Sequence, residues 1–222
     1  MEGADPIVFP EQVTRWWDDG LRVVGLAHYG VSAYAHGTGA AGGLTPKGRE
    51  LLRLMEDIGL VLDVTHLAEE SFWEAVEMFR GPVLASHHNC RALVPGERQL
   101  SDHQIGHLIE RDAVIGVALD VWKLYPDWVL GKTPNTVAGL QTVADHIDHI
   151  CQLAGNARHV AIGSDLDGGF GREQSPCDLD TIADLQRIPD ILRRRAYREA
   201  DIEAVMHNNW LRFFQHAWSP GS

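Results

Sequence analysis

The chain has 222 residues, of which 45% are hydrophobic and 23% charged, and its formal net charge is −12. This composition is typical of a globular protein, and we expect residues 1–222 to form a single domain with a large core. The negative charge argues against a nucleic-acid partner and against an anionic membrane surface. The three cysteines are too few and too widely spaced to indicate a disulfide framework or a cysteine-based zinc site. No apolar run is long enough to cross a membrane and the first residues do not resemble a signal peptide, so we expect a cytoplasmic protein.

Residues 59–89 predict a strand, a helix and a second strand, and a histidine follows each strand. The apolar run 60–64 leads to His66 and the apolar run 82–85 leads to His87. Between them, apolar residues recur at helical spacing, with glutamates on the other side. Near-continuous apolar runs are typical of buried parallel strands. We therefore expect His66 and His87 at the same edge of one parallel sheet, where a strand separation of ~4.8 Å lets two imidazoles reach one metal ion.

The rest of the chain continues the alternation of strands and helices. Thr45 followed by Pro46 predicts one helix start, and Ser101 with Gln104 three positions later predicts another. The other expected elements are a strand over 21–27 that ends at His28, strands over 113–119 and 159–163 that end near Asp120 and Asp165, and helices over 11–19, 136–154, 182–195 and 199–218.

Side chains capable of chemistry follow at least four of these strands. Parallel strands joined by helices indicate an α/β fold. A doubly wound sheet would concentrate its chemistry at one switch point, whereas a TIM barrel gathers residues from the ends of many strands. The pattern therefore favours a (β/α)8 TIM barrel.

Histidine combined with carboxylate is the ligand set of catalytic zinc and related divalent ions. A single histidine at a strand end is more often an ordinary hydrogen-bonded loop residue, but histidines after two consecutive strands favour a metal site. Asp63, inside the strand before His66, is either a ligand or a buried partner. Asp145-His146 and Asp148-His149 lie three positions apart and could clamp a metal, but they are far from any strand end. We interpret them as the solvent-exposed face of a helix.

Several stretches occur in the order typical of a known family: MEGADPI, LRVVGLAH, GLVLDVTH, GPVLASHH and HVAIGSDLDG. On these motifs the chain resembles the membrane (renal) dipeptidase family of zinc metallopeptidases, which have amidohydrolase-like barrels. The resemblance implies a metal-dependent hydrolase that cleaves small dipeptides and uses one or two Zn²⁺ ions.

The resemblance also implies a role for each matching residue. Glu2 matches the glutamate that bridges the metals, and His66 and His87 match the paired strand-end ligands. His28 matches the histidine that polarises the scissile carbonyl. Arg98 matches the arginine that holds the terminal carboxylate, a task that suits a guanidinium fork. Asp165 matches the aspartate that is the candidate general acid and base.

One departure from the family limits these implications. Family members begin with a strand that carries a His-x-Asp motif, and this sequence lacks it. We therefore expect an incomplete barrel of the metal-dependent hydrolase type, with the first two or three strands missing and a sheet edge exposed. A homodimer is among the arrangements that such an edge allows. Two alternatives stay open: a truncated, catalytically inactive barrel fragment that serves as an interaction module, and another amidohydrolase reaction such as deacylation.

Overall fold

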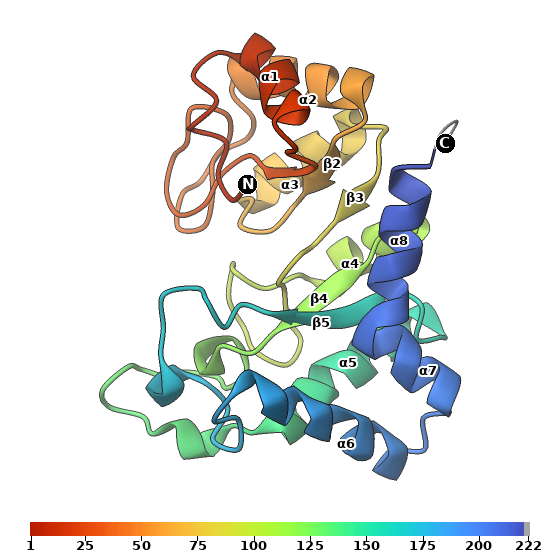
Figure 1. Cartoon of the computed structure of the whole chain (residues 1–222). Coiled ribbons are helices and arrows are strands. Elements are labelled where there is room, and N and C mark those ends of the chain that lie inside the picture. Colours follow the sequence, from red (N-terminus) through yellow and green to blue (C-terminus); the bar gives the residue numbers. More distant parts are fainter. Residues whose placement is uncertain (220–222) are drawn as a thin grey trace. The chain divides into compact units, whose positions relative to one another are not determined.

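The computed structural model describes residues 1–219, which form two compact units (Figure 1). Unit 1 consists of Met1–Ser86 together with the segment that starts at Phe214, and unit 2 consists of His87–Phe213. Both units combine parallel strands with helices, so the α/β prediction is confirmed. The single domain expected from the sequence stays a prediction.

Unit 1 contains a three-stranded parallel sheet in the order β1-β2-β3. Its strands are β1 (Val23–Gly25), β2 (Val61–Asp63) and β3 (Val83–Leu84), and its helices are α1 (Val13–Asp18), α2 (Pro46–Ile58) and α3 (Glu69–Met78), with the 3-10 turn η1 (Pro10–Gln12) before α1. Leu62 pairs with Val83 and Asp63 with Leu84, so β2 and β3 end side by side. The strands are shorter than the apolar runs that predicted them, although residues 60–62 are fully buried as expected.

Helix α2 begins where its local signals predicted. The Thr45 hydroxyl accepts the Gly48 N–H at 3.1 Å, and Pro46 occupies the first helical position of α2. Gly59 ends that helix at φ 81°, a left-handed conformation that favours glycine. In α3 the apolar stripe includes Phe72 and Val76, both buried, while its outer glutamates face water. Burial of this stripe holds α3 against unit 1.

Unit 2 contains a parallel pair of strands, β4 (Ile115–Ala118) and β5 (Val160–Ser164), with a register shift after Val117. Its longer helices are α4 (Asp102–Glu110) and α5 (Leu140–Ala154), and α5 packs against both strands (Figure 1). The predicted capping box is present, because the Ser101 hydroxyl accepts the Gln104 N–H and the Gln104 side chain accepts the Ser101 N–H. Helix α5 begins four residues later than expected, because the backbone at Ala138 and Gly139 is extended.

The two long helices predicted near the C-terminus are divided into shorter pieces. These are the 3-10 helix η5 (Ile182–Arg187), α6 (Ile188–Arg194), α7 (Glu199–Glu203), the π-helical turn η6 (Ala204–Asn208) and α8 (Asn209–Ala217). Three further 3-10 helices lie earlier in unit 2, namely η2 (Val121–Lys123), η3 (Asn135–Val137) and η4 (Arg172–Gln174). Pro189 lies in the first turn of α6, where it has no helical partner to lose. Within residues 1–219, no helix has both the length and the apolar composition that a membrane span requires.

Candidate metal centre and active site

The first residues of the chain run beside β1 and carry Glu2 to the end of that strand. The Gly25 N–H donates to the carbonyl of Met1 at 2.9 Å. The Glu2 carboxylate oxygen Oε1 lies 3.3 Å from His66 Nε2 and 3.8 Å from His28 Nε2. Three of the six residues that the resemblance singled out therefore lie together within unit 1.

His66 is buried, with 3% of its side chain exposed, and its backbone has φ 68°. A non-glycine residue in the left-handed region is strained and is often found at functional sites. The Thr38 hydroxyl lies 3.0 Å from His66 Nδ1 and donates to the His66 carbonyl at 3.3 Å. With the hydroxyl proton used in that way, the contact fits a His66 tautomer that carries its proton on Nδ1. Nε2, the other ring nitrogen, faces the Glu2 carboxylate at 3.3 Å, so both groups offer ligand atoms at one place.

His28 lies beyond the end of β1 and is half exposed. Its ring contacts the ring of His66 edge to face, with centroids 4.3 Å apart, and it also contacts Tyr29 at 4.8 Å. Its backbone carbonyl accepts the Thr38 N–H at 3.0 Å, so the loop that orients His66 also holds His28. The His28 ring is thus accessible to a bound molecule beside His66.

Asp63 ties together the ends of β2 and β3. Its Oδ1 accepts the N–H of Thr65 at 3.0 Å and the N–H of Ser86 at 3.1 Å. Of the two interpretations that the sequence left open, these bonds support the buried partner. His87 follows Ser86 directly in the chain.

Glu2, His66 and His87 form a group that could hold a metal ion. One ligand atom from each lies within 4.8 Å of the other two. Two imidazoles and a carboxylate are the donor set of catalytic zinc sites, which leave a further position open. The residues present therefore fit a divalent ion.

Replacing Asp63 by alanine is expected to lower the free energy of unfolding by about 1–3 kcal/mol, because the N–H groups of Thr65 and Ser86 lose their acceptor. Asp63→Asn keeps an oxygen at the same place and is expected to cost much less. Urea unfolding of both variants measures the difference. Equal stability of Asp63→Ala and the wild type would show that the carboxylate does not hold the strand ends.

In unit 2, two further predicted residues lie beside His87. Arg98 is 2% exposed, and its Nη2 donates to the His87 carbonyl at 3.1 Å. Asp165 follows β5, and its Oδ1 lies 3.9 Å from His87 Nε2. Both residues are thus placed by contacts with His87, which the spacing of the sequence alone did not establish.

Lys123 is a residue that the sequence pattern did not single out, although Asp120, three positions before it, ends a predicted strand. Lys123 Nζ donates to Asp165 Oδ2 at 2.5 Å and lies 3.9 Å from Asp120 Oδ2. Burial lowers the pKa of Lys123, and the nearby Arg98 lowers it further. Burial also raises the pKa of Asp120. The signal that could have found Lys123 is a single lysine close behind an apolar strand.

The interpretation of His146 as part of a solvent-exposed face is wrong. His146 is fully buried on α5, where its Nδ1 accepts the Cys90 N–H at 3.1 Å. Burial lowers its pKa to about 3, and the nearby His149 adds to the effect. The interpretation failed because the face of α5 that carries His146 packs against the loop at Cys90. His149, by contrast, lies near the surface and pairs with Asp102 at 2.7 Å.

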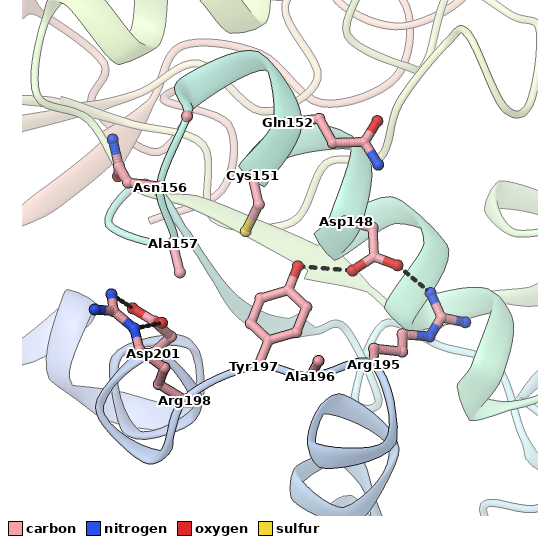
Figure 2. Close-up of a pocket in the computed structure, with 11 residues that line it drawn as sticks. Asp148, Cys151, Gln152, Asn156, Ala157, Arg195, Ala196, Tyr197, Arg198 and Asp201 are labelled. Carbon is pink, nitrogen blue, oxygen red and sulfur yellow. Dashed lines mark hydrogen bonds and ion pairs between the residues drawn. The ribbon is translucent and has the colours of Figure 1, made fainter.

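A separate pocket of about 360 Å³ lies in unit 2, where the end of α5 meets the segment between α6 and α7 (Figure 2). The Tyr197 hydroxyl donates to Asp148 at 2.7 Å, and Arg195 pairs with the same carboxylate. Asp201 pairs with Arg198 at 2.7 Å. Burial raises the pKa of Cys151 to about 11, which makes its thiol a poor nucleophile. Since its carboxylates are paired and no histidine lines it, we assign this pocket no catalytic role.

Comparison with protein families decides the classification. Residues 1–219 match the family described as "Membrane dipeptidase (Peptidase family M19)". The chain belongs to the membrane dipeptidase family. The resemblance inferred from the strand-end motifs is therefore confirmed.

Three similar proteins show how far the similarity extends. An uncharacterized protein from Klebsiella pneumoniae, encoded in the pqqA 5' region, is 31% identical over 79% of this chain. The dipeptidase tcpJ of Claviceps purpurea is 28% identical over 87% of it. A solved metallopeptidase from Rhodobacter sphaeroides, bound to a phosphinate mimic of the dipeptide L-Ala-D-Ala, is 26% identical, with a TM-score of 0.87 over 98% of this chain.

The chain spans only part of the length of these M19 relatives. It covers 62% of the Klebsiella protein, 44% of the Claviceps dipeptidase and 62% of the Rhodobacter metallopeptidase. The likeness therefore establishes the family and the α/β fold of the matched part.

Proposed function

We propose that this M19 chain is the part of a metal-dependent dipeptidase that carries most of its active site. The observation that carries the proposal is the buried His66 imidazole, which presents Nε2 at 3.3 Å from the Glu2 carboxylate. Glu2, His66 and His87 are the proposed metal ligands, and Zn²⁺, as one ion or two, suits them best. When bound, such an ion supplies Lewis acidity, which polarises a carbonyl and lowers the pKa of water toward ~7.

The chain's own residues have separate tasks in the proposed hydrolysis. His28, with an accessible ring, would donate a hydrogen bond to the scissile carbonyl oxygen as negative charge develops on it. Asp165 would accept a proton from the attacking water at its carboxylate and return it to the leaving amine. The contact of Asp165 Oδ1 with His87 supports a place for this carboxylate beside a metal ligand.

Arg98 is the proposed anchor of the substrate's terminal carboxylate. Its guanidinium is buried and is held by the His87 carbonyl, so little side-chain freedom is lost when a ligand binds. A planar fork also suits bidentate pairing with a carboxylate. These features favour a dipeptide with a free C-terminus as the substrate.

We also propose that the strands belong to a (β/α)8 barrel of the metal-dependent hydrolase type, of which this chain contributes a part. The parallel pairing of strands in both units supports this proposal. A homodimer and a cytoplasmic location stay predictions. The alternative of a catalytically inactive fragment and the alternative of a deacylase are separated from the dipeptidase by the following test.

The purified chain, supplied with Zn²⁺, is expected to hydrolyse a dipeptide and to lose that activity on chelation. Arg98→Ala is expected to lower kcat/KM for the dipeptide by about 10- to 100-fold, because charged hydrogen bonds contribute ~1.5–3 kcal/mol. The same variant should lose the preference for the dipeptide over its C-terminal amide. Steady-state kinetics on the two substrates measures both effects.

Arg172→Ala, which changes an exposed arginine paired with Asp180, is the matched control and should behave as the wild type. No zinc-dependent hydrolysis by the wild type would favour the inactive fragment. Hydrolysis of N-acyl amino acids in preference to dipeptides would favour the deacylase. An unchanged selectivity in Arg98→Ala would contradict the proposed anchor.

A further inference from the structure

Lys123 is a buried cation placed next to a proposed catalytic carboxylate. The chain has three lysines, of which Lys47 and Lys132 are exposed, whereas Lys123 is 2% exposed. Its Nζ donates to Asp165 Oδ2 at 2.5 Å, and Asp120 Oδ2 lies 3.9 Å away. Removing a charged group from water is unfavourable unless an opposite charge or hydrogen bonds compensate it. The contact with Asp165 provides that compensation for the buried Lys123 ammonium group.

The backbone that carries Lys123 is itself held from two sides. Its carbonyl accepts Asn89 Nδ2 at 3.1 Å and Gln99 Nε2 at 2.8 Å. Both donors are buried side chains of the loop that follows His87. The backbone of Lys123 is therefore held in place, which a residue needs if its side chain is to position another side chain.

Asp120 also helps to hold the turn that carries Lys123. Its Oδ1 accepts the Trp122 N–H at 3.4 Å, which caps the short helix η2, and also accepts Gln174 Nε2 at 2.9 Å. The Asp120 side chain is 5% exposed. Lys123 thus lies between one carboxylate with partners of its own and a second carboxylate, that of Asp165.

The backbone at Asp165 has a conformation that is unfavourable for residues other than glycine. Ser164 has φ 21° and Asp165 has φ 65°, two consecutive non-glycine residues at positive φ. Such conformations are strained and persist only where neighbouring contacts hold them. The two carboxylate oxygens are used differently, since Oδ2 contacts Lys123 and Oδ1 lies 3.9 Å from His87 Nε2.

We propose that Lys123 is a positioning residue: its ammonium group holds Asp165 Oδ2, so that Oδ1 is the oxygen presented beside His87. The inference deepens the proposed function, in which Asp165 transfers protons. Without the tether, the side chain could rotate and exchange its two oxygens. A misplacement of about 1 Å in a catalytic group can lower a rate by roughly 10²-fold.

The first test does not depend on catalysis. With only three lysines to observe, ¹⁵N-lysine labelling permits assignment of each ammonium signal by NMR. We expect one slowly exchanging ammonium signal, absent in Lys123→Met, shifted in Asp165→Asn and unchanged in Lys132→Met. Absence of a slowly exchanging signal, or a Lys123 signal that does not move in Asp165→Asn, would overturn the proposal.

The second test measures zinc-dependent dipeptide hydrolysis. Lys123→Met keeps the length of the side chain and removes its charge, so kcat should fall by about 10- to 100-fold while KM stays within about twofold. Lys123→Arg should restore part of kcat, and Lys132→Met should match the wild type. An unchanged kcat in Lys123→Met would contradict the positioning role. If no form hydrolyses dipeptides, the proposed function fails, whereas the ammonium signal still decides the Lys123–Asp165 contact.

Discussion

Replacing His66 by alanine is expected to lower the affinity of the chain for Zn²⁺ by about 100-fold or more, with hydrolysis lost in parallel. Loss of a residue that merely orients a metal ligand already lowers metal affinity by ~10–100-fold. Loss of a proposed ligand itself is expected to lower the affinity further. His66 is buried and its Nε2 lies 3.3 Å from the Glu2 carboxylate, so the variant loses one imidazole donor of the proposed site. Calorimetric titration with Zn²⁺ and a metal assay of the purified variant measure the change.

A graded series makes the result specific to the site. Thr38→Val removes the hydroxyl that contacts His66 Nδ1 but keeps the side-chain shape, and it should cost ~10–100-fold in affinity. His207→Ala changes an exposed histidine of η6 and should leave metal binding unaltered. If His66→Ala and His207→Ala bound Zn²⁺ equally well, the proposed metal centre would be wrong.

His146 is expected to make the stability of the protein fall steeply as the pH decreases. Its pKa is lowered from 6.5 to about 3 in the folded state, mainly by burial and then by His149. Below pH 6.5 the unfolded chain takes up a proton that folded His146 does not, so the stability present above that pH is lost as the pH falls toward 3. The slope approaches ~1.4 kcal/mol per pH unit from this residue.

Urea unfolding at several pH values between 7 and 4 measures this dependence. His146→Gln keeps an oxygen that can accept the Cys90 N–H and does not titrate, so its free energy of unfolding should depend less on pH than that of the wild type. Because carboxylates also contribute to the slope, the comparison is the difference between the two proteins. His207→Gln is the matched control. Parallel pH profiles of wild type and His146→Gln would contradict the low pKa.

An element could be predicted from the sequence when the residues that define its ends lie close together in the chain. The start of α2 depends on Thr45 and Pro46, and that of α4 on Ser101 and Gln104, which are neighbours in the chain, and both starts were predicted correctly. The segment 182–218 was predicted as two helices, but it contains η5, α6, α7, η6 and α8 as separate pieces. Its apolar periodicity was visible, whereas the positions of the breaks depend on packing.

The sequence by itself determined the family, the α/β class and the residues that follow each strand. Strand and helix periods, capping residues and motif order are all written in short stretches of chain, where covalent geometry leaves few alternatives. Only the tertiary structure decided which distant residues meet. Thr38 contacts His66, 28 positions away, and Lys123 contacts Asp165, 42 positions away. His146 is buried against Cys90, 56 positions away. Such contacts arise when elements pack together, and neither partner carries a local mark of the other. Burial and hydrogen bonding, which set the protonation of His146 and the orientation of Asp165, therefore emerge only once the chain is folded.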